Sequence, residues 1–460
     1  MRFEGSGAGG GRLWSAPVRA LSVAAVLGAL ALVGTACGSS GDGGSTSAGT
    51  TAAASTAAAD TTAADTTAST TSGDTAAAGT VGVDASQLAS ESEVQSLMDE
   101  AFGGGVTVND LPPIAQEAYK MYAKPITSEE KKVIERCLTT SGVCDLGKTN
   151  PEAKLAVAES EDTDNPYYKS VRAVYLLQAL REPTVKSVNF TQASFKVPAA
   201  LSNFRSHISQ GADVIVGAFD LGDVMLPVVK QAAAKGIPVW SSTQTIPSAK
   251  YDGTDLAGDT LTDLCAYGKT MGEIALKSGK NIAMYTGTPG NTYAPQWQEC
   301  AKQAIKDGGG TITTNGTTNW TPQGEQQAAA ALAAKGLPDA IIYDYAPEAF
   351  IRKFLQLGKT PPTMVGGSQT MGSVGAWLDA KKKGKDFKSY IAASEITFAV
   401  PSLHAAVATK NGIDVEKRIK LPQPVVPVQD VVKYYSPDFP AGANFGSGLP
   451  KDILQYSFSH

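Results

Sequence analysis

Histidine is scarce in this sequence, whose 460 residues contain only His207, His404 and His460. None of them lies near a pair of cysteines, so a zinc site built from Cys and His ligands is not expected. The sequence also lacks a Gly-x-Ser-x-Gly elbow, a His-Glu-x-x-His motif and a cysteine next to a general base. Hydrolytic catalysis therefore lacks its usual side chains, and we expect neither an enzyme nor a bound metal or cofactor.

An apolar run long enough to span a membrane is missing as well. The run Ala20–Thr35 has about 16 apolar or small residues, whereas about 20 are needed to cross a bilayer core. Three arginines precede it, which is typical of a cleaved export signal. The run leads into Leu-Val-Gly-Thr-Ala-Cys, which resembles a bacterial lipobox, although Gly34 stands where Leu is usual. We predict a lipoprotein signal peptide over residues 1–36 and lipidation of Cys37; an ordinary signal peptide with a chance cysteine is the alternative.

Apolar side chains larger than Ala are absent from residues 38–80, which are Gly, Ser, Thr, Ala and a few Asp. Such a composition cannot form a core, so residues 37–80 are expected to be a disordered tether. A flexible chain of this length reaches roughly 35–40 Å on average. It would hold an extracytoplasmic domain close to the membrane to which its lipid is anchored.

Positive charge is not in excess. The formal net charge of −5 becomes about −7 without the signal peptide, which holds three Arg and one Glu. This balance argues against nucleic acid or anionic lipid as the main partner.

Cysteines are few, and lipidation of Cys37 would leave Cys137, Cys144, Cys265 and Cys300. An even number in an oxidising compartment favours disulfides, for which three pairings are possible. Cys137 and Cys144 close a short loop and form the natural local pair, which leaves Cys265 with Cys300. Four free thiols are the alternative.

The rest of the chain, about 380 residues, is too long for one compact core and indicates two lobes. Residues 81–150 show helical spacing, with capping-box patterns at Ser90 with Glu93 and at Thr127 with Glu130. We predict a helical annex over 81–150, whose role the sequence does not reveal.

From residue 154 onward, short apolar runs alternate with helical stretches, which predicts parallel sheets with right-handed crossovers. The block Ala-Ala-Lys-Gly-Ile-Pro at 233–238 recurs as Ala-Ala-Lys-Gly-Leu-Pro at 333–338. This echo indicates two similar halves or, equally, two generic helix-to-strand turns. The expected strands are Lys154–Ala158, Val185–Phe190, Asp213–Phe219, Pro238–Ser242, Asn281–Thr286, Thr311–Thr314, Ala340–Asp344, Thr363–Gly367 and Tyr390–Ser394.

Several sequence blocks, in order over about residues 152–435, resemble the type I periplasmic binding proteins of bacterial ABC importers, with the ribose-binding branch most similar. The blocks are Lys154–Ala158 with Asp164–Tyr168, Gly211–Val216 with Gly236–Val239, Asp263 with Gly268-Lys269, Gly287 with Gly290, and Val365-Gly366-Gly367. The resemblance implies an α/β fold of two Rossmann-like lobes with parallel sheets. We expect one lobe over 152–262 with 398–425 and the other over 263–397 with 426–460, joined by a hinge near 245–263 and 395–401.

Ligands of open parallel sheets bind beyond the carboxyl ends of the strands. Aromatic faces on those loops suit sugar C–H faces or aromatic ligands, and amides suit hydroxyls, although any of these rings can instead pack in a lobe core. We expect Tyr167, Tyr168 and Trp320 to clamp the ligand, with Asn165 and Gln244 as polar contacts. All candidate ligand-binding residues are Asn165, Tyr167, Tyr168, Phe219, Asp220, Thr243, Gln244, Trp297, Trp320, Tyr345, Ser368 and Gln369.

The Asp, Arg and Asn anchors of ribose-type proteins are replaced by aromatic, apolar and neutral polar residues. Their positions hold Thr243, Gln244, Leu264, Trp297, Tyr345 and Ser368. Because a charge-assisted hydrogen bond is about twice as strong as a neutral one, a simple pentose is not expected. A modified sugar, a cyclic polyol, or an aromatic or alicyclic compound fits better. Asp220 and Glu395 are candidates for recognising a cationic group, although Asp220 is equally suited to cap a helix and Glu395 to be a solvated charge.

The resemblance implies a solute-binding lipoprotein that delivers a small molecule to the permease of an ABC importer. The alternatives are a ligand-sensing subunit of a membrane signalling protein and a binder of a non-sugar aromatic or alicyclic compound. A cytoplasmic repressor of the same fold does not fit the export signal. The expected partners are the small molecule, the permease and, through the lipid, the membrane, but not nucleic acid.

Overall fold

A computed structural model describes residues 83–162, 164–393 and 395–460. The predicted signal peptide, Cys37 and the predicted tether lie outside the described residues. In these three ranges, no helix is long and apolar enough to cross a membrane. The described residues form two mostly parallel sheets flanked by helices, which confirms the predicted fold class.

The first sheet has seven strands in the order β1-β3-β2-β4-β5-β6-β12. All neighbours are parallel except β1 and β3. Its strands are β1 (Val143–Asp145), β2 (Leu155–Glu161), β3 (Val185–Gln192), β4 (Val214–Gly217), β5 (Val239–Ser242), β6 (Gly258–Leu261) and β12 (Arg418–Lys420). Its flanking helices are α4 (Pro166–Arg181), α5 (Val197–Ser209), α6 (Leu226–Ala233) and α12 (Ala399–Lys410).

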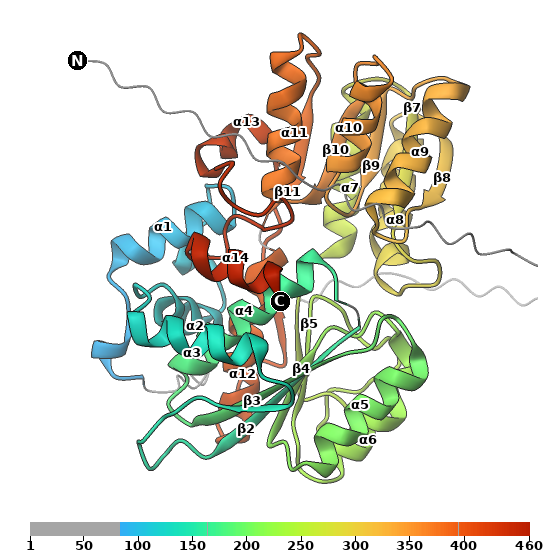
Figure 1. Cartoon of the computed structure of the whole chain (residues 1–460). Coiled ribbons are helices and arrows are strands. Elements are labelled where there is room, and N and C mark those ends of the chain that lie inside the picture. The colour runs from blue at the N-terminus through green and yellow to red at the C-terminus, as the bar shows by residue number, and fades with distance from the viewer. Residues whose placement is uncertain (1–82, 163, 394) are drawn as a thin grey trace, which may run out of the picture. The chain divides into compact units, whose positions relative to one another are not determined.

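Strand β4 shows why helices cover both faces of this sheet. Val214 and Val216 join the hydrophobic cluster of α4 and α12, whereas Ile215 joins that of α5 and α6. Successive side chains of a strand point to opposite faces, so a continuous β-branched run needs apolar cover on both sides. Figure 1 shows α5 and α6 together on one side of the strands.

The second sheet has six strands in the order β13-β11-β10-β9-β7-β8, of which only β13 is antiparallel. Its strands are β7 (Asn281–Thr286), β8 (Thr311–Thr317), β9 (Ala340–Tyr343), β10 (Thr363–Ser368), β11 (Ser389–Ala392) and β13 (Val425–Pro427). Ile282 and Met284 pack with α7 and α8, while Ala283 and Tyr285 pack with α9 and α10. The helices are α7 (Leu264–Leu276), α8 (Tyr293–Asp307), α9 (Pro322–Lys335), α10 (Glu348–Gln356) and α11 (Met371–Lys382).

The chain passes between the sheets three times, between β6 and α7, between β11 and α12, and between β12 and β13. The predicted division of the chain into lobes has its borders at 262/263, 397/398 and 425/426. The C-terminal residues, which the sequence placed in the second lobe, divide between two sites. Strand β13 pairs with β11, whereas α14 (Lys451–Ser459) packs against α3 (Ser128–Thr139) and α4.

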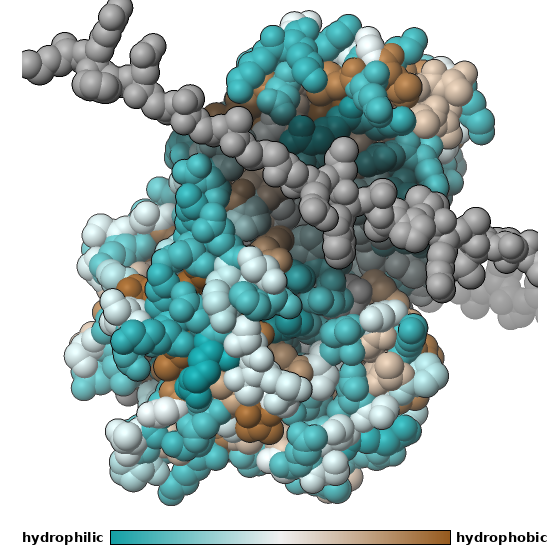
Figure 2. Space-filling view, in the orientation of Figure 1, coloured by the Kyte–Doolittle hydropathy of each residue, from teal (hydrophilic) through white to brown (hydrophobic). Residues whose placement is uncertain are grey.

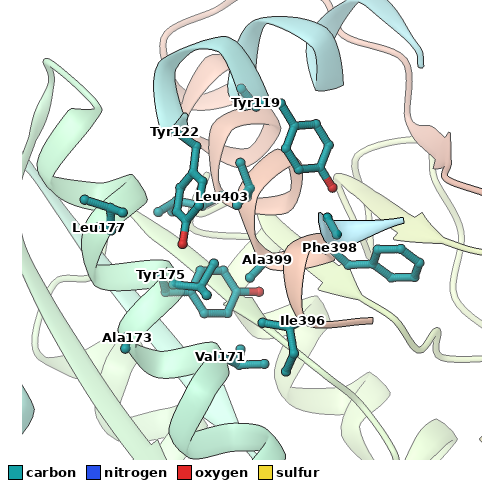
Figure 3. Close-up of a cluster of buried hydrophobic side chains, with 14 of the residues drawn as sticks. Tyr119, Tyr122, Val171, Ala173, Tyr175, Leu177, Ile396, Phe398, Ala399 and Leu403 are labelled. Carbon is teal, nitrogen blue, oxygen red and sulfur yellow. The ribbon is translucent and has the colours of Figure 1, made fainter. Parts of the chain in front are cut away.

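The annex contains α1 (Glu91–Ala101), α2 (Pro113–Tyr122) and α3, and its last residues form β1 at the edge of the first sheet. Both predicted capping boxes are present, at Ser90 and at Thr127. Figure 3 shows Tyr119 and Tyr122 in the hydrophobic cluster formed with α4 and α12. The Tyr119 hydroxyl donates to the carbonyl oxygen of Thr397 at 3.1 Å, so the annex reaches the second crossing between the lobes.

Both expected disulfides are present, Cys137–Cys144 and Cys265–Cys300. The first joins the end of α3 to β1, and the second joins α7 to α8. Figure 2 shows that hydrophilic residues cover most of one face of the described surface. The large hydrophobic side chains that are exposed in the described part stand apart from one another in the sequence: Val143, Val224, Leu337 and Leu357.

Candidate ligand-binding site

Loops that follow strands of both sheets meet around one cavity of about 600 Å³, part of it open to solvent. The site begins where the first sheet turns into α4. Asn165 accepts a hydrogen bond from the backbone N–H of Tyr168 at 3.1 Å and so caps this helix, with Pro166 at its first position. The cap fixes the start of the helix that carries Tyr167 and Tyr168 at the cavity wall.

Most of the candidate residues lie together around this cavity. Those that line it are Asn165, Tyr167, Tyr168, Asp220, Thr243, Gln244, Trp320, Tyr345 and Ser368. Their contact with a ligand stays a prediction, because a shared wall is a condition for binding and not a measurement of it.

Three candidates are placed elsewhere. Phe219 is buried in the hydrophobic cluster of α5 and α6. Trp297 is buried in the core of the second lobe, from which its indole N–H donates to Asp344 at 3.1 Å. Gln369 is buried and donates to the carbonyl oxygen of Phe445 at 2.5 Å. Packing within the lobes accounts for all three, the alternative already raised for the aromatic side chains.

Sequence reasoning missed further lining residues, which are Phe195, Thr262, Tyr293, Asp344, Phe398 and Gln423. The expected strand Ala340–Asp344 includes Asp344, whereas β9 ends at Tyr343. With the exact end of this strand, Asp344 would have been a candidate for the loop at the cavity. Thr262, Phe398 and Gln423 lie at the three crossings between the lobes. No local pattern marks a crossing segment as cavity wall, because its position depends on how the lobes pack.

The backbone is strained at this site. Phe195, Thr243 and Trp320 have positive φ angles of 56°, 65° and 50°. Residues other than glycine adopt such angles rarely, and strained backbone of this kind clusters at active sites and ligand clamps. Trp320 also requires Gly287, because a Cβ atom there would lie 1.8 Å from the indole ring.

The two lobes touch across the cavity. The ring centroids of Phe195 in the first lobe and Trp320 in the second are 5.9 Å apart. The backbone N–H and the hydroxyl of Thr292 both donate to the carbonyl oxygen of Asp220 at 3.3 Å. The cavity therefore has walls from both lobes, and a molecule inside it would contact both.

Asp344 is buried in the second-lobe wall. Its carboxylate accepts hydrogen bonds from the indole N–H groups of Trp320 at 2.9 Å and Trp297 at 3.1 Å, and from the hydroxyl of Thr286. Burial raises the pKa of Asp344 to about 6, against the effect of these donors.

Asp220 is the carboxylate of the first-lobe wall. The Tyr168 hydroxyl donates to its Oδ2 at 3.3 Å, while its Oδ1 is buried without a hydrogen-bond partner. Burial raises the pKa of Asp220 to about 7, and the charge of Asp344 adds to this shift. The short helix after it has no side-chain cap, so Asp220 is not a helix cap. The side chain of Glu395, the other candidate for a cation, lies outside the described part.

Residues 160–391, about half of the chain, match the family model of the periplasmic binding protein domain. No curated protein sequence matches the chain. Similar solved structures include the periplasmic binding protein component of the arabinose ABC transporter from Shewanella sp. ANA-3, at 19% identity and a TM-score of 0.54. It covers 60% of this chain, and 93% of its own length is matched.

Two other similar structures differ in their stated roles. An ABC transporter solute-binding protein from Bacillus halodurans C-125 with bound myo-inositol has 19% identity and a TM-score of 0.53, over 62% of this chain and 99% of that one. The fructose-binding periplasmic domain of a hybrid two-component system has 17% identity and a TM-score of 0.52, over 60% and 92%. At these identities the likeness establishes the two-lobed fold.

Proposed function

Because the chain belongs to the periplasmic binding protein family, we propose that it is the extracytoplasmic receptor of an ABC-type importer. It captures a small molecule between its lobes and delivers it to the permease. The observation that carries this proposal is the cavity lined from both lobes, with aromatic and polar side chains at the ends of parallel strands.

Ligand capture would favour the closed arrangement of the lobes. A ligand shifts a conformational equilibrium only as far as it binds one state better than the other. Tyr167 and Asp220 come from the first lobe and Trp320 and Tyr345 from the second. A ligand that needs both walls binds the closed form better, and that form would dock on the permease.

The receptor would be held at the membrane by lipidation of Cys37 after removal of residues 1–36, with 37–80 as its tether. The apolar run, the lipobox-like residues and the Gly-, Ser-, Thr- and Ala-rich stretch support this part of the proposal. A sensory role is the second candidate, which the likeness to the periplasmic domain of a two-component system supports. Both roles use the same ligand-dependent closure.

A thermal-shift screen of the purified chain tests the receptor function. Sugars, polyols, amines and aromatic acids are added singly, and a ligand at about 100 times its Kd should stabilise the fold by ~2.7 kcal/mol. Stimulation of the importer's ATPase by the liganded form then separates transport from sensing. Failure of every compound to stabilise the protein, with no ligand retained from the cell, would contradict a receptor.

A further inference from the structure

The charged side chains in the described lining of the cavity are all acidic. Two carboxylates line it, Asp220 and Asp344, and the described residues of its lining include no Lys, Arg or His. Arg172, which lies on the same helix as Tyr168, is engaged by Glu161 and Asp164. Burying two carboxylates without a cation costs free energy. The described side chains of the lining leave the negative charge of both carboxylates uncompensated.

Asp220 also leaves a hydrogen bond unmade. The residue is 6% exposed, and its Oδ1 has no donor. Gln244, which is 8% exposed and lines the same cavity, has an unpartnered Oε1. Buried acceptors are nearly always paired in folded proteins. The cavity therefore contains buried hydrogen-bond acceptors to which a ligand could donate.

The carboxylate of Asp344 accepts hydrogen bonds, but none of its hydrogen-bond donors carries a positive charge. Its partners Trp297, Trp320 and Thr286 are neutral donors. They orient the carboxylate and lower the cost of burying it without cancelling its charge. Both lobes thus contribute one uncompensated acid to the same cavity.

We propose that the ligand is an organic amine in its ammonium form, which donates an N–H to Asp220 Oδ1 and lies between Asp220 and Asp344. This inference rests on the proposed receptor function and names the substrate class of that same cavity. The remainder of the ligand is an apolar or aromatic body of limited size, since rings make up much of the wall.

The aromatic residues suit such a ligand in two ways. The rings of Tyr167, Phe195, Trp320 and Tyr345 line the cavity from both lobes. An ammonium group within about 6 Å of a ring face is attracted by the ring, more strongly when water is excluded. The same rings provide apolar contact for the carbon body.

Charge also couples the ligand to closure. Asp220 and Asp344 belong to different lobes, and the charge of Asp344 helps to raise the pKa of Asp220 to about 7. The closed empty form therefore brings two like charges together, unless a proton is taken up. A cation between them removes that repulsion only in the closed form, which is the differential affinity that closure requires.

Neutral solutes and metal ions fit this geometry less well. A polyol hydroxyl can donate to a carboxylate, but it leaves both charges uncompensated. In the described residues, no group of three or more His, Cys, Asp or Glu side chains is placed to hold a metal ion. A ligand that carries both positive charge and apolar surface satisfies the acids and the rings together.

The test compares each amine with the alcohol of the same carbon skeleton by isothermal titration on the purified full chain. The pairs are tyramine and tyrosol, cyclohexylamine and cyclohexanol, and 1,4-diaminobutane and 1,4-butanediol, with myo-inositol and L-arabinose as neutral solutes. At least one amine should bind roughly 30-fold more tightly than its alcohol. Asp220→Asn should remove this preference, whereas the exposed control Asp386→Asn should keep it.

The unmutated protein gives a second readout. From about pH 7.5 to about pH 5 the amines stay protonated, while Asp220 and the groups facing it, Asp162, Asp344 and Tyr168, gain or keep protons. Amine affinity should fall about tenfold over this range, and alcohol affinity should not change.

Equal affinity for both members of every pair, including no binding by either, would overturn the inference. Unchanged amine binding by a folded Asp220→Asn variant would do so too. Binding of myo-inositol or L-arabinose without any amine preference would leave the receptor function standing and remove only the ligand class.

Discussion

Trp320 contributes both an aromatic ring and a hydrogen-bond donor to the site. Its ring lines the cavity and packs over Gly287, and its indole N–H donates to Asp344 at 2.9 Å. Trp320→Ala removes both, so we expect affinity for the ligand to fall about ten- to a hundredfold, the effect of losing ~1.5–3 kcal/mol of apolar burial. Trp320→Phe keeps a six-membered aromatic ring and removes the donor to Asp344.

Calorimetric titration and thermal unfolding of both variants separate these contacts. The Phe variant should bind more tightly than the Ala variant. An Ala variant that unfolds easily yet binds normally would show that Trp320 serves the core of the lobe and not the ligand.

Asp220 should also make the stability of the empty protein depend on pH. Burial raises its pKa from 3.8 to about 7 in the folded state, so the folded state binds this proton more tightly than the unfolded state. Its contribution to stability is therefore complete below about pH 3.8 and is lost as the pH rises towards 7. Asp220→Asn should raise the free energy of unfolding at neutral pH by on the order of 1–3 kcal/mol.

Urea unfolding of the wild-type protein, Asp220→Asn and Asp386→Asn at about pH 5 and pH 7.5 measures this effect. Asp162 and Asp344 have raised pKa values as well, so the wild-type slope is shared and the difference between variants isolates Asp220. A wild-type slope that survives Asp220→Asn unchanged would contradict the assignment.

The candidate site was predictable where one rule applied. The loops and helix starts that follow the strands of a parallel sheet lie at its carboxyl edge, and this rule places Tyr168, Asp220, Gln244 and Tyr345 at the cavity wall. The rule predicts which loop lies at the cavity but not which way each side chain points. It therefore could not distinguish Phe219, whose ring lies in the core, from Asp220 beside it. Direction depends on packing that no local pattern encodes.

At the level of whole elements, strands that contain an apolar run were predictable, and the three-residue strands and β6 were not. Every expected strand is present, with ends shifted by a few residues. Strands β1, β12 and β13 were missed because three residues carry too little periodicity, and β6 was missed because it begins with Gly258-Asp259 and has no apolar run. Gly258 in β6 reads as a loop residue, yet a Cβ atom there would lie 2.3 Å from the Trp240 ring, so the close approach of two elements requires it.

Helix α12 carries a buried ion pair that ties it to α4 and to the annex. His404 Nδ1 lies 2.7 Å from Glu182 Oε1, and Nε2 lies 3.7 Å from Glu117 Oε2. Burial by itself lowers the pKa of His404, but the two acids raise it to about 9. His404→Leu leaves Glu182 buried without its cation, so stability should fall by about 3 kcal/mol or more.

The pH profile checks the charge of this histidine. Because the folded pKa is raised, the stabilisation is complete below pH 6.5 and is lost as the pH rises through about 9. Urea unfolding at about pH 6 and pH 9.5 should show this loss in the wild-type protein and not in His404→Leu. The exposed His460→Gln is the control, and a similar loss in all three proteins would argue against a role of His404.

For the molecule as a whole, the proposed lipidation of Cys37 predicts attachment to the membrane. Cys37 lies outside the described residues, and the disulfides use every cysteine of the described part. Cys37→Ala should therefore release the protein from the membrane without changing its thermal unfolding. Fractionation after a high-salt wash measures this, and a variant that still sediments with membranes would contradict lipid anchoring.

Closure of the lobes can be tested away from the cavity wall, at Gly222. This residue has a φ of +64°, and a Cβ atom there would lie 2.5 Å from Cγ2 of Thr292 in the other lobe. Gly222→Ala therefore places a methyl group between the lobes, and we expect about tenfold weaker ligand binding because the closed form is disfavoured. Thr292→Ser removes only Cγ2 and keeps the hydroxyl that donates to Asp220.

The double variant Gly222→Ala with Thr292→Ser decides the cause. Backbone strain at position 222 lowers stability by roughly 1 kcal/mol whether or not Thr292 is changed. The clash between the lobes disappears with Cγ2. Affinity should thus recover in the double variant while thermal stability does not, and small-angle scattering should show a more extended unliganded form only for the single variant. A double variant that binds as weakly as Gly222→Ala would mean that local strain, and not closure, controls affinity.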